Sequence, residues 1–129
     1  MTRVLVADDH PAYRRGVVRA LERAGLEVVG QAGDGAAALE LARRLEPDVA
    51  LLDLRMPEAS GSEVASALRE EGSPTRVVVL SAFDEPELVS AALLAGVYGY
   101  LSKDSSRADI VGAVSAAADG QPVASQDGA

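Results

Sequence analysis

Residues 49–57 read VALLDLRMP, and this stretch decides how the rest of the chain is interpreted. Four apolar residues run directly into Asp53, and Pro57 follows four positions later. A short continuous apolar run of this kind is typical of a strand buried on both faces of a parallel sheet. Open parallel sheets carry their sites at the carboxyl ends of the strands. The carboxylate that ends this run therefore indicates a strand that emerges into a polar site.

The rest of the chain alternates between short apolar runs and segments of helical periodicity. Strands are predicted at 3–7, 26–32, 48–53, 76–82 and 97–103, and helices at 11–24, 36–46, 62–71, 84–95 and 105–119. With right-handed crossovers, this order predicts an α/β fold, a doubly wound sandwich of a five-stranded parallel sheet and five helices. We expect one domain over residues 1–119, and a tail or the start of an interdomain linker over 120–129.

Composition excludes several classes of protein. The 129 residues include no cysteine, which argues against a disulfide scaffold or a zinc finger and suits a cytoplasmic protein. No apolar run approaches the roughly 20 residues that a membrane helix needs. The net charge of −8 and the 3% aromatic content argue against direct nucleic-acid binding by this chain.

Polar residues stand at four of the five predicted strand ends. Asp8 and Asp9 follow the first strand, Asp53 ends the third, Ser81 lies near the end of the fourth and Lys103 ends the fifth. Because the carboxyl ends of parallel strands meet at one edge, these side chains are expected to converge. Neighbouring carboxylates raise one another's pKa, and a hard divalent cation such as Mg²⁺ relieves their repulsion. A carboxylate can also attack phosphorus and form an acyl phosphate, whose charge Lys103 and Mg²⁺ would neutralise.

Taken singly, each of these residues has an ordinary structural explanation. Asp8 and Asp9 could cap a helix, Ser81 could be an unremarkable strand-end hydroxyl, and Lys103 could be a solvated charge. His10 is interpreted as a turn or cap residue. The set carries the prediction because each member stands at its own strand end.

Four segments together resemble the receiver domain of bacterial two-component response regulators, in the order that this family shows. The motifs DDHP, GDG, LLDLRMP and GYLSKD are similar to those of the NarL/FixJ-type subfamily, whose members regulate transcription through a helix-turn-helix. The matching segments are VADDHP (6–11), LLDLRMPEASG (51–61), VVVLSAFDE (77–85) and GVYGYLSKD (96–104).

The resemblance implies a flavodoxin-like (CheY-like) fold and a phosphoacceptor rather than an enzyme. A partner histidine kinase would pass a phosphoryl group to Asp53, with at most slow self-phosphorylation and self-dephosphorylation. Asp8, Asp9, Asp53 and the backbone carbonyl of Arg55 would bind Mg²⁺, and Lys103 would pair with the phosphoryl group. No helix-turn-helix follows, so we expect no output domain in this chain and no DNA binding by it.

The resemblance also implies a conformational switch. Ser81 would hydrogen-bond the phosphoryl group, and Tyr100 would turn inward as Ser81 moves, although Tyr100 could equally be a half-buried strand aromatic. Phe83 lies with them around the helix predicted at 84–95, whose faces are candidates for the responding surface. Alanines of the last helix could permit a phosphorylation-dependent homodimer, or could reflect helix propensity alone. They are Ala113, Ala116, Ala117 and Ala118.

Three alternatives remain from the sequence. Residues 33–38, GDGAAA, match a dinucleotide-binding spacing with Asp53 as the acidic partner, although Gly that permits a positive φ in a tight turn also explains them. A carboxylate-nucleophile phosphatase would need an acid two residues after Asp53, where Arg55 stands. A pseudo-receiver would have the fold without phosphorylation.

Overall fold

The computed structural model describes residues 1–82 and 86–123, and strands and helices alternate along this part of the chain. The strands are β1 (Arg3–Ala7), β2 (Glu27–Ala32), β3 (Val49–Asp53), β4 (Arg76–Ser81) and β5 (Gly99–Ser102). The helices are α1 (Pro11–Arg23), α2 (Gly35–Leu45), α3 (Gly61–Glu70), α4 (Pro86–Leu94) and α5 (Arg107–Ala118). The predicted fold class is confirmed.

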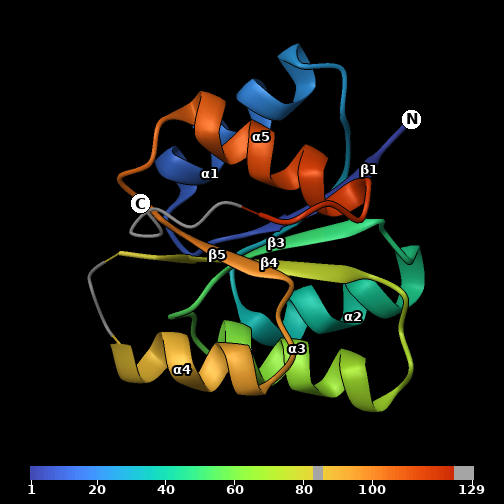
Figure 1. Ribbon diagram of the computed structural model, residues 1–129, viewed down its shortest axis with the longest axis vertical. Helices are drawn as coiled ribbons and strands as arrows, with labels where there is room; N and C mark the ends of the chain where they lie inside the picture. Colours follow the sequence, from blue (N-terminus) through green and yellow to red (C-terminus); the bar gives the residue numbers. More distant parts are fainter. Residues whose placement is uncertain (83–85, 124–129) are drawn as a thin grey trace.

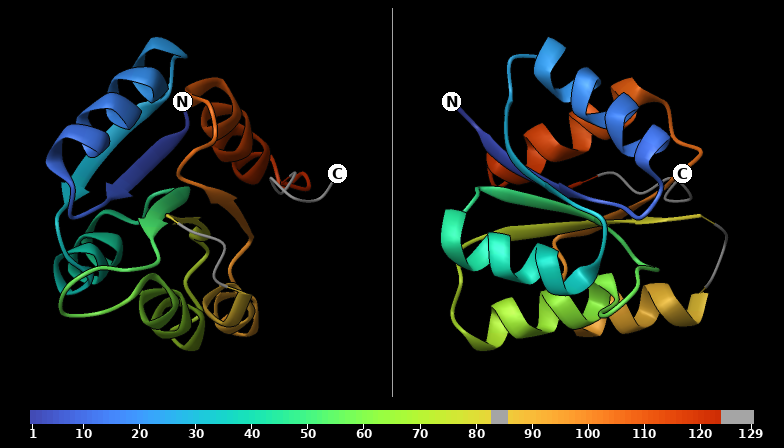
Figure 2. Two further views of the ribbon diagram at one scale, coloured as in Figure 1. Left: turned by 90° about the vertical axis from the view of Figure 1, so that its left-hand side faces the viewer. Right: turned by 180° about the vertical axis from the view of Figure 1, so that it is seen from behind.

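All neighbouring strands pair in parallel, and the order across the sheet is β2-β1-β3-β4-β5. Helices α1 and α5 cover one face, and α2, α3 and α4 cover the other (Figures 1 and 2). The chain therefore winds outward from β1 in both directions, and β3 lies at the centre of the sheet. Such a sheet places its site at the carboxyl ends of the central strands.

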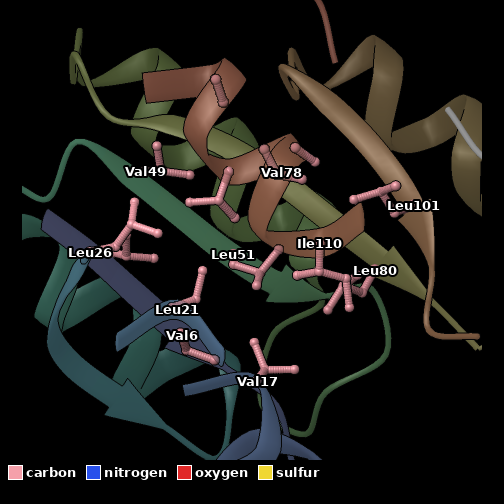
Figure 3. Packing of buried hydrophobic residues seen from close by; sticks show 14 of the residues in the cluster. Val6, Val17, Leu21, Leu26, Val49, Leu51, Val78, Leu80, Leu101 and Ile110 are labelled. Atoms are coloured by element: carbon pink, nitrogen blue, oxygen red, sulfur yellow. The ribbon is translucent and has the colours of Figure 1, made fainter. Parts of the chain in front are cut away.

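Every residue of β3 is buried, as the opening stretch predicts. Val49 and Leu51 belong to the hydrophobic cluster beneath α1 and α5 (Figure 3), whereas Ala50 and Leu52 belong to the cluster beneath the other three helices. The strand alternates between two apolar layers until Asp53. The layers thus hold Asp53 on a strand that has no room to shift.

The observed bounds differ from the predicted ones mainly near the fifth strand. Strand β5 is shorter than predicted, so Lys103 lies in the turn that follows it. Helix α5 begins two residues late because Ser106 caps it, accepting a hydrogen bond from the Asp109 amide at 3.0 Å. Phe83, the first two residues of the predicted 84–95 helix and residues 124–129 of the predicted tail lie outside the described residues.

The GDGAAA segment differs from the prediction in why it needs a glycine. Neither Gly33 nor Gly35 has a positive φ, so that explanation is wrong. Gly35 is required by close packing, because a Cβ at this position would lie 1.9 Å from the carbonyl oxygen of Ala59. Its amide donates to the Pro57 carbonyl at 3.0 Å, and Asp34 caps α2. The contacts of Gly35 with Ala59 and Pro57 therefore join α2 to the loop after β3.

The helices in the described ranges are all too short or too polar to span a membrane.

Replacing Gly35 by Ala is expected to lower the free energy of unfolding by about 1–3 kcal/mol, because the new methyl group forces the loop at Ala59 to move. Gly112→Ala is the matched control, since Gly112 lies inside α5 and a Cβ there meets nothing within 4 Å. It should raise stability by about 0.5–1 kcal/mol through helix propensity. Urea unfolding followed by circular dichroism measures both, and equal effects of the two variants would contradict the packing argument.

Candidate functional site

The register of the sheet brings the predicted site residues to one edge. The ends of β1 and β3 are paired, so Asp8, which follows β1 directly, comes beside Asp53 at the end of β3. The ends of β4 and β5 are paired at Ser81 and Ser102, and Lys103 comes next. The topology therefore produces the convergence expected from the sequence.

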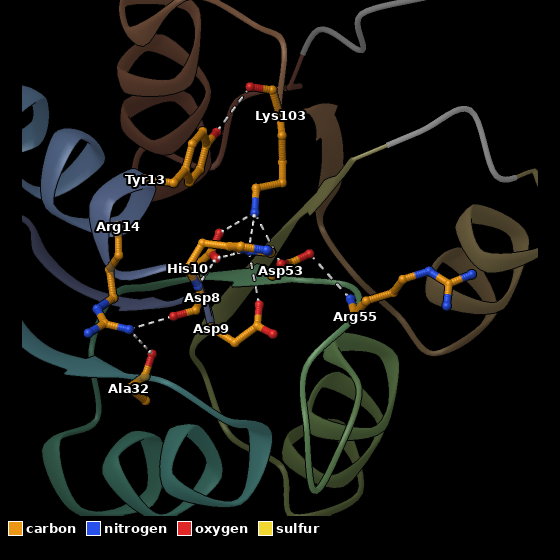
Figure 4. A network of polar contacts seen from close by, with 9 residues as sticks. All are labelled: Asp8, Asp9, His10, Tyr13, Arg14, Ala32, Asp53, Arg55 and Lys103. Atoms are coloured by element: carbon orange, nitrogen blue, oxygen red, sulfur yellow. Dashed lines mark hydrogen bonds and ion pairs between the residues drawn. The ribbon is translucent and has the colours of Figure 1, made fainter.

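Lys103 bridges two of the carboxylates (Figure 4). Its Nζ lies 2.7 Å from Asp8 Oδ2 and 3.2 Å from Asp53 Oδ2. Both aspartates are buried, and the lysine side chain is only 11% exposed. The Lys103 amide also donates to the Ser81 carbonyl at 2.8 Å, which fixes where the side chain begins. A single ammonium thus balances two buried carboxylates in an environment that screens charge weakly.

His10 lies within this cluster, which the sequence analysis did not expect. Its Nδ1 lies 3.1 Å from Oδ1 of both Asp8 and Asp9, and 3.3 Å from Lys103 Nζ. His10 occupies the N-cap position of α1, but its side chain makes no capping hydrogen bond. The position was predicted correctly, whereas the ring contacts the site instead of the helix end.

Tyr13 contacts Lys103 from the first turn of α1. Its hydroxyl donates to the Lys103 carbonyl at 3.3 Å, and Lys103 Nζ lies 4.4 Å from the centre of the ring. The Arg107 guanidinium at the start of α5 lies 4.6 Å from the same centre. Cations at these distances are attracted to the ring. Tyr13 therefore positions the lysine and joins α1 to α5.

Arg14 fixes the backbone on the other side of the cluster. Its guanidinium donates to the Asp8 carbonyl at 2.5 Å and to the Ala32 carbonyl at 3.4 Å, and its Nε donates to Gln31 Oε1 at 3.2 Å. The Asp8 amide donates to the Ala32 carbonyl at 3.0 Å. Asp8 is consequently tied to the end of β2 before its side chain meets Lys103.

Burial and charge act in opposite directions on the two central groups. Burial raises the pKa of Asp53 above 3.8, and the nearby Asp8 carboxylate adds to this, while Lys103 opposes it. For Lys103, burial alone lowers the pKa, but the contacts with Asp8 and Asp53 outweigh it and the net shift is upward. The lysine therefore stays charged, and the Asp53 carboxylate is held at a cost in free energy.

The donor atoms of the cluster suit a divalent cation. One oxygen from each of Asp8, Asp9 and Asp53 and one nitrogen of His10 lie within 4.8 Å of one another. Three carboxylates face one ammonium, so two negative charges remain unbalanced. Hard oxygen donors with excess negative charge are the usual environment of Mg²⁺.

Asp9 and Arg55 lie at the open side of the cluster. The side chain of Asp9 is 33% exposed. The Arg55 amide donates to Asp53 Oδ1 at 3.2 Å, while its guanidinium extends away from the carboxylates (Figure 4). The backbone of Arg55, rather than its side chain, therefore faces the site.

Ser81 and Tyr100 lie where the sequence places them. Ser81 is buried at the end of β4, beside the carboxyl end of β3. Tyr100 is half-buried in the middle of β5 and packs on the cluster beneath α2, α3 and α4. Their positions are those that the predicted switch requires, and the switching role itself stays a prediction.

Sequence reasoning missed three contributors: His10, Tyr13 and Arg14. His10 follows two acidic residues directly, and Tyr13 and Arg14 follow Pro11 within the first helical turn. A helix that starts at a strand end points its first turn toward that edge, which is the signal that could have found them.

The comparisons with known proteins agree with this geometry. The profile of the response regulator receiver domain matches residues 4–115. The "Probable transcriptional regulatory protein NarL" of Mycobacterium tuberculosis is 56% identical over 122 residues, which cover 94% of this chain and 56% of that protein. The nitrate/nitrite response regulator NarP of Escherichia coli is 45% identical over 124 residues, covering 95% and 58%. The chain thus spans little more than half the length of these curated relatives.

Solved structures give the same result. The signal receiver domain of NarL from Mycobacterium tuberculosis superposes with a TM-score of 0.91 at 55% identity, covering 93% of this chain and 98% of that one. The isolated receiver domain of RcsB from Salmonella enterica, solved with the phosphomimetic BeF₃⁻, has a TM-score of 0.86 at 25% identity, covering 98% and 94%. Sheet order, acidic edge and sequence agree, and the chain belongs to the response regulator receiver domain family, with NarL- and NarP-type regulators among its relatives.

Proposed function

We propose that Asp53 accepts a phosphoryl group from a partner histidine kinase and that this modification controls a transcriptional output. The observation that carries the proposal is the Asp53 carboxylate itself, buried at the end of β3, 3.2 Å from the Lys103 ammonium and beside two further carboxylates. Response regulator receiver domains are signalling proteins, and this placement fits a phosphoacceptor.

The chemistry is a nucleophilic displacement at phosphorus. An Asp53 oxygen would form a bond to phosphorus while the bond from phosphorus to the imidazole nitrogen of the kinase breaks, and that nitrogen would retain the electron pair. Lys103 would pair with the phosphoryl oxygens, and the Ser81 hydroxyl would donate to one of them. Asp8, Asp9, Asp53 and the Arg55 carbonyl would hold Mg²⁺, which supplies positive charge to the phosphoryl oxygens when bound.

The surface beside Asp9 leaves room for a donor. A cleft of about 410 Å³ opens there, lined in part by Arg55, Pro57, Ser60 and Leu88. Ser60 and Glu63 hydrogen-bond each other in a capping box at the start of α3, which holds Ser60 in place at the edge of this cleft. We propose that turnover is limited to slow loss of the phosphoryl group to water, because the position two residues after Asp53 is an arginine whose side chain points away and supplies no acid.

We also propose how the chain is organised. The receiver occupies residues 1–119, residues 120–129 form a tail or linker, and the protein acts in the cytoplasm. Because the chain spans little more than half of its curated relatives, a transcriptional output through a DNA-binding part is inferred from relatives described as transcriptional regulatory proteins.

A phosphorylation-dependent homodimer is the proposed response, and α4 is its best-supported surface. Leu93 and Leu94 of this helix are 52% and 82% exposed. On α5, by contrast, Ala113 and Ala117 are buried against the sheet, so only part of the alanine set is accessible. Three arginines line the open groove between α1 and α5, and a symmetric contact there would bring like charges together.

Intact mass after incubation with Mg²⁺ and acetyl phosphate is expected to show one phosphoryl adduct, which requires Mg²⁺ and is absent from Asp53→Asn. Lys103→Ala should slow its formation by about 100-fold, the usual effect of losing a group that stabilises developing charge. The control is Asp104→Asn, which replaces an exposed carboxylate next to Lys103. This variant should behave as the wild type. No adduct on the wild type would favour a pseudo-receiver, and an adduct on Asp53→Asn would identify a different acceptor.

Asp53→Asn is expected to stabilise the fold near neutral pH. The pKa of Asp53 is raised in the folded chain, so wild-type stability falls as pH rises from 3.8 through the folded value, and the asparagine variant avoids this loss. Lys103 keeps Asp8 as its partner at 2.7 Å. Urea unfolding across this range should show the gain disappearing below pH 3.8, and a variant that is less stable than the wild type near neutral pH would contradict the raised pKa.

Sedimentation with beryllofluoride and Mg²⁺ should convert the wild type from monomer to dimer. Leu94→Ser should reduce this conversion by about tenfold or more, since it removes an exposed apolar side chain from the proposed contact. Val111→Ser, a half-buried position on α5 beside the other groove, is the comparison. A dimer that is lost only in Val111→Ser would place the contact on α1 and α5 instead.

A further inference from the structure

The His10 imidazole is directed into the acidic cluster although nothing in the helix requires it to be there. The side chain is 66% exposed, and its contacts through Nδ1 are with Asp8, Asp9 and Lys103 (Figure 4). An exposed histidine at an N-cap position could extend into solvent. Its orientation toward the carboxylates is therefore a property of the site.

Backbone hydrogen bonds fix the position of His10 beside Asp8. The His10 amide donates to Asp8 Oδ1 at 2.8 Å, and its carbonyl accepts from the Arg14 amide at 3.0 Å as the first bond of α1. Pro11 follows at the first helical position, where its fixed φ suits the start of a helix. The ring and the Asp8 carboxylate are thus held side by side before any ligand arrives.

The distances also fit one coordination shell. Ligand atoms on an edge of an octahedron lie about 3 Å apart when the metal–ligand bonds are near 2.1 Å. Nδ1 lies 3.1 Å from an oxygen of Asp8 and 3.1 Å from an oxygen of Asp9. Nδ1 faces two carboxylate oxygens at 3.1 Å and the Lys103 ammonium at 3.3 Å, so the tautomer of the ring decides whether Nδ1 donates or accepts. In the tautomer that leaves its lone pair free, Nδ1 can bind a metal ion.

We propose that His10 is a metal ligand that gives this site a preference for later first-row transition ions such as Co²⁺ over Mg²⁺. Imidazole binds ions of that row such as Co²⁺ and Ni²⁺ well, whereas Mg²⁺ favours oxygen donors and keeps its waters. The inference rests on the proposed metal site of the phosphoacceptor and adds a nitrogen donor to its oxygen ligands. Mg²⁺ would bind through the oxygens alone, whereas Co²⁺ would also bind the ring nitrogen.

A His10 ring that only donates hydrogen bonds to the carboxylates predicts a different effect of its removal on metal binding. If Nδ1 carried a proton and served only to donate to the carboxylates, a metal ion would have to displace the ring. Removing the ring would then tighten the binding of both ions. If His10 is a ligand, its removal weakens Co²⁺ binding and leaves Mg²⁺ binding nearly unchanged.

The test is calorimetric titration of the whole chain with Co²⁺ and with Mg²⁺, for the wild type, His10→Ala and His10→Gln. Both variants should weaken Co²⁺ binding by about tenfold or more and change Mg²⁺ binding by less than about twofold. His10→Gln retains a hydrogen-bonding side chain without the imidazole, so it separates ligation from simple polar contact. Circular dichroism confirms that the exposed substitutions leave the fold intact.

A spectroscopic measurement tests ligation directly. His10 is the only histidine of the chain, so its ring signals need no further assignment. Binding of Co²⁺ should give strongly shifted ring-proton resonances that are absent from His10→Ala. Unshifted ring signals with Co²⁺ bound, or an equal Co²⁺-to-Mg²⁺ preference in the wild type and His10→Ala, would overturn this inference and leave the proposed metal site standing. If neither ion binds the wild type, the proposed metal site fails as well.

Discussion

The burial of the Asp53 carboxylate at the end of the central strand is the constraint on which the rest of this structure depends. Two apolar layers hold β3 in place, and the alternation of its side chains ends at a charged group. Removing that charge from water is unfavourable, and the Asp8 carboxylate beside it increases the cost. Lys103 offsets part of it at 3.2 Å. The fold therefore holds the Asp53 carboxylate at an electrostatic cost, at the position that is proposed to accept the phosphoryl group.

The positions of Lys103 and Asp8 around this carboxylate are maintained by contacts from distant parts of the chain. Tyr13 on α1 positions Lys103 after β5, and Arg14 on the same helix fixes Asp8 after β1. Arg107 on α5 shares the ring of Tyr13. The first turn of α1 thus determines where the lysine and one of its carboxylate partners lie. A lysine suits this position because its compact charge on a flexible stem can move from one carboxylate to another, which a planar guanidinium does less easily.

Much of the fold and most of the site could be predicted from the sequence because buried parallel strands leave a simple signature. The apolar run before Asp53 predicted the central strand, and the edge residues Asp8, Asp9 and Lys103 followed from the parallel order. The purpose of Gly35 could not be predicted, since it depends on the carbonyl of Ala59, a residue from another loop. The contacts of His10 depend on how α1 leaves the sheet edge, and a sequence fixes that angle only through packing.

Charge balance links phosphorylation to metal binding in this site. Three carboxylates and one ammonium leave two unbalanced negative charges at the sheet edge. Phosphorylation would replace the single negative charge of Asp53 by about two. The number of unbalanced negative charges would then rise to about three. A bound dication lowers this repulsion, and it lowers it more in the phosphorylated chain. By linkage, a ligand that strengthens metal binding more in the phosphorylated form than in the unphosphorylated form stabilises the phosphorylated form by that difference. Where a nitrogen ligand at His10 has this effect, the equilibrium extent of phosphorylation depends on which metal ion is present.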